Sequence, residues 1–551
     1  MKTTVESPKT SYDISELFAL ITKQAEAIER LEKQVADYEA LAKRVAEQDI
    51  IIAKQAALIK WYEGQLLMLK RNRFGTSSER IDGDYRQMTI LGDIEVPPPP
   101  AEVEDVTIKR TKRVGKREED LANLPVVRVD HKLDDVSCPS CTTPMRDIGV
   151  KVRHEVEIIP AQAILKEHAA HSYACPNIKC QEEQGKQTVV TANAPSPLIA
   201  GSLATPSLVA HIVYQKYSQG LPLYRIEKGF QFDGVNISRQ CMANWVIKCV
   251  QLHLHKIYDC LVMHFLQETY AHSDATSVQV LKEVGKTARS KSTEWVYCTG
   301  TGANHKIKLY EYRPSHSEKH VHEFLKSFRG FLHTDGHKVY RNLSPDIIVV
   351  GCWAHARRYW EKIWKALPED SRKGSDADTG LQYINALFKL ERKFSELAPK
   401  ERYEKRLEES RPISDAFFAW ADNLGALPKT LLGEAVSYAK NQRTYLENVF
   451  LDGNLELSNN RCERAVKPFV MGRKAWLFST TPEGAGASSV MYSIIETAKE
   501  NGLHPFQYVK FLLETLPNMK EHSDFDELMP WGQDIPDYCK IQTMKQRKSH
   551  L

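Results

Sequence analysis

Apolar residues recur at alternating steps of three and four from Ile14 to about Leu69. Along the seam that ends at Leu66, 13 of 16 positions are apolar. This spacing predicts a coiled coil through which copies of the chain self-associate, with a long amphipathic helix folded back on its own protein as the alternative. Gln24 and Asp49 interrupt the seam and are expected to fix its register.

The next segment is polar and rich in proline. Residues 69–80 place four cations around a Phe-Gly break, which fits either a phosphate contact or a solvated loop. Four prolines at 97–100 predict an extended spacer. Six basic residues at 109–117 follow, and they form either a flexible arm that binds the DNA backbone or a solubilising linker.

From about residue 203 the apolar positions follow a helical period that breaks at Asp233–Gly234. These helices form either a helix-turn-helix reader or a helical layer that supports the following domain. Their many residues of the type usually buried favour the supporting layer.

The pattern then changes to short runs rich in β-branched and aromatic residues. Three runs with turn signals between them predict an antiparallel meander, and alternating helices and strands follow. The strands are expected at 270–281, 294–300, 307–314, 330–336 and 346–353, and the helices at 316–328 and 354–367. This order describes a ribonuclease-H-like α/β fold, interrupted by a charged helical insertion.

Three acidic residues occupy defined places in this expected fold. Asp274 lies in the first strand and Asp335 at the end of the fourth, so neighbouring strands bring them together although they are 61 positions apart (335 − 274). Glu463 opens a helix that starts at Asn459–Asn460, while Glu496 on a later helix is the rival third carboxylate. Such a cluster suits Mg²⁺ or Mn²⁺, and two ions can clamp both reacting oxygens of a phosphodiester.

Basic residues surround the third carboxylate. Five cations fall within the 14 positions from 461 to 474, and two more follow the fifth strand. Their density suits a nucleic-acid strand passing the metals, although each one alone also fits a solvated surface charge. The candidate DNA-binding residues are Arg461, Arg464, Lys467, Arg473, Lys474, Arg357 and Arg358. For Trp353 and Trp476, core packing is the expected role.

Two pairs of cysteines predict a zinc site. Cys138 and Cys141 are followed after 33 residues by Cys175 and Cys180. Four thiolates can surround zinc tetrahedrally and leave no open position, so a structural zinc ribbon is expected. The substitute ligands are His154, His168 and His171, although a lone histidine is more often a surface residue.

The composition limits the expected cellular location and the expected binding partners of the protein. The 551 residues carry 75 basic and 71 acidic side chains, a net charge of +4, so a nucleic-acid partner is inferred from local patches. No apolar run reaches about 18 residues and no signal core opens the chain, which predicts a cytoplasmic protein without a membrane partner. The seven scattered cysteines are expected to be buried thiols.

Four motifs resemble the transposases of the insertion-sequence-66 family of bacterial mobile elements. They are GCWAHARRYW (351–360), NNRCERAVKPF (459–469), GRKAWLFS (472–479) and SIIETAKENGLHPFQY (493–508). The family tends to carry Asp-Glu-Thr-Pro at its first catalytic aspartate, where this chain has Asp274-Ala-Thr-Ser277.

The resemblance implies an acidic-triad DNA transposase. Asp274, Asp335 and Glu463 would hold two divalent ions, nick the element ends and join the 3′-hydroxyl to target DNA. Small companion proteins of the same element are further expected partners. A nuclease without strand transfer and a zinc-containing DNA-binding regulator are the alternatives.

The chain is expected to contain eight segments. They are a coiled coil with a basic end (1–80), a linker (81–125), a zinc-binding domain (126–192), a helical region (193–265), a first catalytic part (266–366), a helical insertion (367–450), a second catalytic part (451–515) and a tail (516–551).

Overall fold

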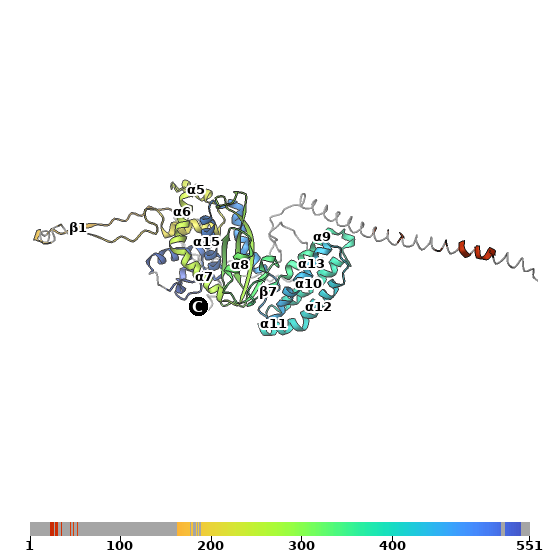
Figure 1. Cartoon of the computed structure of the whole chain (residues 1–551). Coiled ribbons are helices and arrows are strands. Elements are labelled where there is room, and N and C mark those ends of the chain that lie inside the picture. Colours follow the sequence, from red (N-terminus) through yellow and green to blue (C-terminus); the bar gives the residue numbers. More distant parts are fainter. Residues whose placement is uncertain are drawn as a thin grey trace, which may run out of the picture. The chain divides into compact units, whose positions relative to one another are not determined.

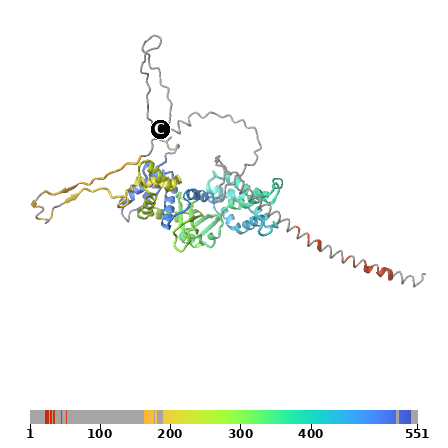
Figure 2. The same ribbon diagram turned by 90° about the horizontal axis from the view of Figure 1, so that it is seen from above.

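A computed structural model (Figures 1 and 2) describes residues 22–26, 28–30, 33, 35, 44, 45, 48, 52, 162–176, 178, 179, 183, 186, 189–519 and 524–541. The chain divides into two compact units, Met1–Ile81 with Trp353–Gly453, and Asp82–Cys352 with Asn454–Leu551. Each unit is described by itself. Among the described helices, none is both long and apolar enough to span a bilayer.

A five-stranded mixed sheet forms the centre of the second unit, in the order β5-β4-β3-β6-β7. Its strands are β3 (Tyr270–Gln279), β4 (Lys291–Thr299), β5 (Lys308–Arg313), β6 (Gly330–Thr334) and β7 (Ile347–Gly351). The first three are antiparallel, and β6 and β7 run parallel to β3. The predicted meander and the two predicted strands after it are therefore confirmed.

Helices accompany this sheet throughout the second unit. They are α4 (Pro206–Val213), α5 (Leu223–Phe232), α6 (Arg239–Cys249), α7 (His255–Gln267), α8 (Glu318–Phe324), α14 (Asn460–Trp476), α15 (Pro482–Glu500) and α16 (Pro505–Thr515). The π-helical turns η1 (Tyr214–Ser218) and η2 (Val250–Leu254) extend α4 and α6, and the 3₁₀ turns are η3 (Lys338–Tyr340), η7 (Leu516–Asn518), η8 (Asp526–Leu528) and η9 (Asp537–Cys539).

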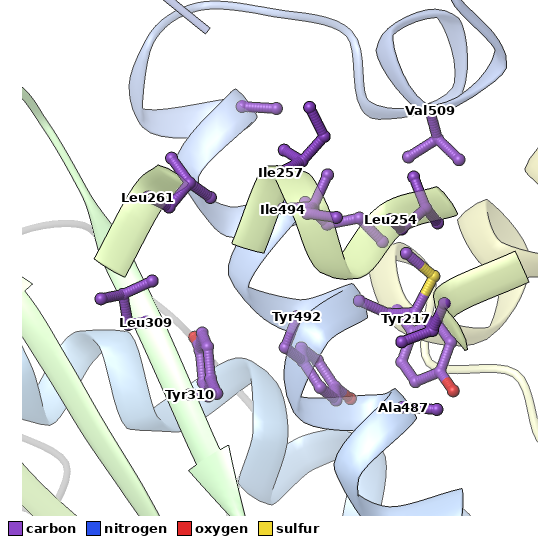
Figure 3. Close-up of a cluster of buried hydrophobic side chains, with 14 of the residues drawn as sticks. Tyr217, Leu254, Ile257, Leu261, Leu309, Tyr310, Ala487, Tyr492, Ile494 and Val509 are labelled. Atoms are coloured by element: carbon purple, nitrogen blue, oxygen red, sulfur yellow. The ribbon is translucent and has the colours of Figure 1, made fainter. Parts of the chain in front are cut away.

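The helices before β3 share one core with the sheet. Figure 3 shows Ile257 and Leu261 of α7 in the same buried cluster as Ile494 of α15 and Tyr310 of β5. On α6, Trp245 and its apolar neighbours are also buried in this core. The helices before β3 were predicted to be either a helix-turn-helix reader or a supporting layer, and this packing fits the supporting layer.

Side chains of α15 also form hydrogen bonds with the backbone of the outer edge of β5. The backbone N–H of Tyr310 donates to Ser493 Oγ at 2.8 Å, and that of Lys308 donates to Thr497 Oγ1 at 3.0 Å. Thr497 Oγ1 donates in turn to the Lys308 carbonyl at 2.9 Å. Two hydroxyls one helical turn apart thus take the place of a neighbouring strand.

Glu294 on β4 is a buried carboxyl group in this core. Its exposure is 0%, and burial raises its pKa well above the usual value, against a smaller opposing effect of the neighbouring Ser489 hydroxyl. The folded state therefore binds a proton more tightly than the unfolded state does. Stability is lost as the pH rises above the unfolded value of about 4.3.

We expect Glu294→Gln to raise the melting temperature at pH 8 and to change it little near pH 4. The neutral amide avoids the cost of ionising a buried group. Calorimetry over this pH range measures the difference, with the exposed Glu527→Gln as the matched control. Parallel pH profiles for Glu294→Gln and the unmodified chain would show that the carboxyl group is not held protonated.

A helical bundle makes up the Trp353–Gly453 part of the first unit. It contains α9 (Trp353–Ala366), η4 (Glu369–Ser371), α10 (Asp376–Lys393), α11 (Pro399–Lys405), η5 (Arg406–Ser410), α12 (Arg411–Asp422), α13 (Leu431–Glu447) and η6 (Asn448–Leu451). The sequence placed α9 with the catalytic core, but it groups with the insertion because its indole rings pack there. Trp353 and Trp360 are fully buried beside Phe417, and Trp353 Nε1 donates to the Leu446 carbonyl at 3.0 Å.

The amino-terminal predictions fall mostly on residues outside the described ones. Five seam positions are described and helical: Gln24, Ile28, Val35, Val45 and Ile52. The four apolar ones are 49–59% exposed. The short strands β1 (Ser172–Ala174) and β2 (Val189–Thr191) pair antiparallel. Cys138, Cys141 and Cys180, His154, the proline spacer and the basic segments at 69–80 and 109–117 lie outside the described residues. Cys175 is described and half-buried, whereas His168 and His171 are exposed.

Candidate active site

The register between β3 and β6 brings the first two candidate carboxylates together. His272 pairs with His333 in parallel strands, and Asp274 and Asp335 each follow this pair by two residues, so the same strand direction carries both toward one region. Asp274 lies within β3, whereas Asp335 follows the last residue of β6. The sequence predicted this neighbourhood from the order of the strands alone.

Local hydrogen bonds orient both aspartates. Asp274 Oδ1 accepts from the Ala275 N–H at 2.7 Å, and Asp335 Oδ1 accepts from the His337 N–H at 2.9 Å. Burial raises the pKa of Tyr340, and the charges of Asp335 and Asp274 raise it further. Both aspartates therefore act on one buried phenol.

Glu463 lies in the first turn of α14, as the sequence predicted. It is 6% exposed, and its N–H donates to the Asn459 carbonyl at 3.1 Å. The neighbouring Cys462 thiol has its pKa raised by burial, by Cys298, and by the charges of Asp274 and Glu463. The first and third carboxylates thus both act on Cys462, and the structure brings the three candidates to one region of the second unit.

Asn459 connects the start of α14 to β3. Its side chain makes no cap hydrogen bond to the helix. Instead, Asn459 Oδ1 lies 2.9 Å from His272 Nδ1, and Nδ2 donates to the Ser273 carbonyl at 2.9 Å. Its backbone N–H lies 3.1 Å from Cys352 Sγ after β7. Asn459 therefore fixes the turn that carries Glu463 against the strand that carries Asp274.

A buried histidine pair lies beside this connection. The rings of His272 and His333 stack with centroids 4.4 Å apart, and His333 Nε2 lies 3.3 Å from the Glu456 N–H. Burial lowers the pKa of His272, and the charge of Glu456 and the hydrogen bond to Asn459 oppose this shift. His272 was not predicted as a site residue, although its position two residues before Asp274 places both on one strand face.

Asn459→Ala is expected to reduce the Mg²⁺- or Mn²⁺-dependent cleavage that the sequence predicts by roughly 10- to 100-fold. The change removes the partners of the His272 ring and the Ser273 carbonyl, at about 1–3 kcal/mol for each unsatisfied group. Because the first turn of α14 loses its anchor, the Mn²⁺ concentration for half-maximal activity should rise. A Mn²⁺ titration of activity measures this rise, and the exposed Asn518→Ala is the control. An unchanged titration would contradict a positioning role.

Glu496 belongs to a different environment. It is 5% exposed, and its Oε1 lies 2.7 Å from Lys499 Nζ on the same helix. Burial of Tyr310 on β5 raises the pKa of this phenol, and the charge of Glu496 raises it further. This carboxylate thus belongs to the packed face of α15, as its apolar neighbours suggested.

The candidate DNA-binding residues differ in their exposure and in their partners within the protein. Arg461 donates from Nε to Glu456 Oε1 at 2.6 Å, and Arg473 donates from Nη1 to Thr276 Oγ1 at 3.1 Å. Arg464 and Lys474 are exposed on α14, and Lys467 is half-buried. In the helical unit, Arg357 bonds to Asn385 and Glu361, and Arg358 contacts His355.

Four family models match the chain. The model described as Transposase IS66 family matches residues 201–487, and the IS66 C-terminal element matches 493–531. The zinc-finger binding domain of transposase IS66 matches 135–177, and the Transposase C of IS166 homeodomain matches 61–129. The zinc-finger match includes three of the four candidate cysteine ligands.

Curated relatives occur in Sinorhizobium fredii. The uncharacterized protein y4qI is 29% identical over 63% of this chain, which spans 66% of that relative's length. The uncharacterized protein y4jD is 26% identical over 85% of this chain and 93% of its own length. The uncharacterized protein y4hP is 23% identical over 72% of this chain and 73% of its own length.

Proposed function

The chain belongs to the IS66 transposase family, and from this premise we propose that it cleaves the ends of a mobile DNA element and joins them to target DNA. The observation that supports the proposal is the β3–β6 pairing of His272 with His333, two residues before each aspartate, together with the action of both aspartate charges on Tyr340. Glu463 in the first turn of α14 completes the proposed acidic triad.

We assign the central sheet to the ribonuclease-H-like fold. Three antiparallel strands are followed by two strands parallel to the first, in the order β5-β4-β3-β6-β7. The helical unit enters the sequence between β7 and α14. It is therefore an insertion between the second and third proposed catalytic carboxylates.

The donor set fits Mg²⁺ or Mn²⁺, because hard cations prefer carboxylate oxygens. The charges of the three carboxylates converge on the buried side chains of Tyr340 and Cys462, where a dication would offset them. When bound, two such ions activate a hydroxyl nucleophile and stabilise the charge on the phosphodiester. Asp274, Asp335 and Glu463 would hold them, and Asn459 would keep Glu463 in register with β3.

DNA would lie along α14 in this proposal. Arg464 and Lys474 are exposed on the helix and Lys467 is half-buried, so these three are available to phosphates. Arg461 already pairs with Glu456 inside the protein. Its proposed role changes from DNA contact to support of the segment that precedes α14.

We also propose that the amino-terminal seam pairs two or more copies, as holding two DNA ends requires. A fragment of residues 1–80 is expected to be helical and self-associated at tens of micromolar, an ordinary affinity range. Ile28→Lys with Leu31→Lys should separate it by placing charges in the seam. Sedimentation measures both species, and a monomeric unmodified fragment would exclude this mode of assembly.

A strand-transfer assay tests the proposed function. The substrate is a duplex that carries the DNA flanking the reading frame, and the readout is its joining to a plasmid in Mg²⁺ or Mn²⁺. Cleavage with joining supports a transposase, whereas cleavage alone indicates the related nuclease. Binding without metal-dependent cleavage indicates a DNA-binding regulator. Omitting a small companion protein of the element tests whether one is needed.

A further inference from the structure

α14 ends in a strained turn centred on Leu477. The backbone of Leu477 has φ 70° and ψ −47°, and the Phe478 N–H donates to the Trp476 carbonyl at 2.9 Å. These angles and the bond between residues i and i+2 define a γ-turn with positive φ, which is rare and strained for a branched side chain. Such strain persists only where the surrounding structure imposes it.

Both sides of this turn are fixed. On the helical side, the Leu477 N–H donates to the Arg473 carbonyl at 2.7 Å. On the other side, the chain after the turn adds to the end of β3: the Ser479 N–H donates to the Gln279 carbonyl, and the Lys282 N–H donates to the Thr480 carbonyl, both at 2.9 Å. Helix and sheet together therefore determine the conformation of Leu477.

Leu477 is the more exposed of the two apolar side chains at the turn. Phe478 is 41% exposed and lines a cavity of about 10 Å³ together with Glu294, Arg473 and Trp476. Leu477 is 66% exposed and gains little from burial within the protein. A strained backbone that presents an apolar side chain to solvent suggests that the side chain has a partner outside the chain.

The surroundings of Leu477 favour DNA as that partner. The exposed Lys474 precedes it by three residues, and the exposed Arg464 lies on the same helix. Met471, also on α14, is 64% exposed, so apolar and cationic groups alternate along the helix. Leu477 follows Glu463 by 14 positions (477 − 463), or about 21 Å at 1.5 Å per residue. Such a length corresponds to about six base pairs of duplex.

We propose that Leu477 is an apolar wedge that enters a base step of the DNA end, about six base pairs from the phosphate held at the carboxylates. The inference rests on the proposed function and names a further DNA-contacting residue of it. Arg464 and Lys474 would bind phosphates and so hold the duplex. Leu477 would enter one base step through the groove and unstack it. Because helix and sheet already fix the turn, the wedge needs no ordering upon binding.

The experiment places 2-aminopurine, which brightens when unstacked, at single positions of a duplex carrying the DNA that flanks the reading frame. The full chain is added in Ca²⁺, so that binding is read without cleavage. The unmodified chain is expected to raise fluorescence about threefold at one or two steps, roughly four to eight base pairs from the cleaved phosphate. Leu477→Ala should abolish the rise, and Leu477→Met should retain most of it.

Two further variants separate the wedge from folding. Leu477→Gly relieves the positive φ and removes the side chain, so it should melt no lower than the unmodified chain and still lose the fluorescence rise. Leu252→Ala removes another leucine, 51% exposed, and should leave the signal unchanged. A rise that survives in both Leu477→Ala and Leu477→Gly would overturn the proposal.

Other outcomes distinguish this inference from the proposed function. If the unmodified chain cleaves and joins the duplex but no position brightens, the wedge is wrong and the transposase assignment stands. If it neither cleaves nor binds the duplex, both fail together. If Leu477→Ala alters only self-association in sedimentation, the projecting leucine is a protein contact and the DNA wedge is excluded.

Discussion

Glu463→Gln is expected to abolish cleavage and strand transfer in Mg²⁺ or Mn²⁺ while sparing folding and DNA binding. The amide keeps the size of the side chain and its place in the first turn of α14, but it loses the ligand charge that a hard cation needs. Loss of several kcal/mol of transition-state stabilisation corresponds to about a 10³-fold fall in rate or more. Single-turnover cleavage of a labelled DNA end measures it.

Glu496→Gln is the matched control. This carboxylate is equally buried, but it pairs with Lys499 on the core face of α15. Its variant should keep substantial activity, and any loss should follow from reduced stability. The reverse pattern, with Glu463→Gln active and Glu496→Gln inactive, would mean that the third ligand lies on α15.

Cys138→Ser with Cys141→Ser is expected to unfold the small domain and to weaken DNA binding. The zinc-finger match spans these residues, and coordination by all four predicted cysteines would leave no open position on the zinc. Structural zinc supplies about 10–16 kcal/mol to such domains, so loss of two ligands removes the basis of the local fold. Zinc content per chain and limited proteolysis of residues 126–192 measure the change.

The catalytic core should remain folded in this variant, since its buried residues form their own cluster. Cys260→Ser, which changes a half-buried thiol of α7, is the control and should retain zinc. Protein purified without chelator and found to contain no zinc would exclude the site. Retention of zinc after loss of Cys138 and Cys141 would exclude this ligand set.

The strands and the neighbouring aspartates could be predicted because their signals are local or follow from strand order. Runs of β-branched and aromatic residues identify β3, β4 and β5, and parallel pairing of the fourth strand with the first brings Asp335 to Asp274. The start of α14 was visible as Asn459–Asn460, which positioned Glu463 in its first turn. These inferences needed only periodicity and topology.

Side-chain partners could not be predicted in the same way, because they depend on three-dimensional register. Asn459 looked like a helix cap, but its amide bonds to β3, 186 residues earlier in sequence. Arg461 is predicted to contact DNA, and the sequence does not reveal that its guanidinium group also pairs with Glu456. The positive φ of Leu477 has no local sequence signal, since glycine is the residue that usually marks such a position.

The hydroxyls of α15 that cover β5 have a consequence for biosynthesis. Ser493 lies 183 residues after Tyr310, so the sheet edge leaves the ribosome long before its cover exists. During that interval the nascent chain presents unpaired N–H and C=O groups, the feature by which exposed edge strands recruit other chains. A product that stops before α15 would therefore tend to aggregate. Chaperones that hold β5 during synthesis should increase the yield of the intact protein more than that of its isolated helical bundle.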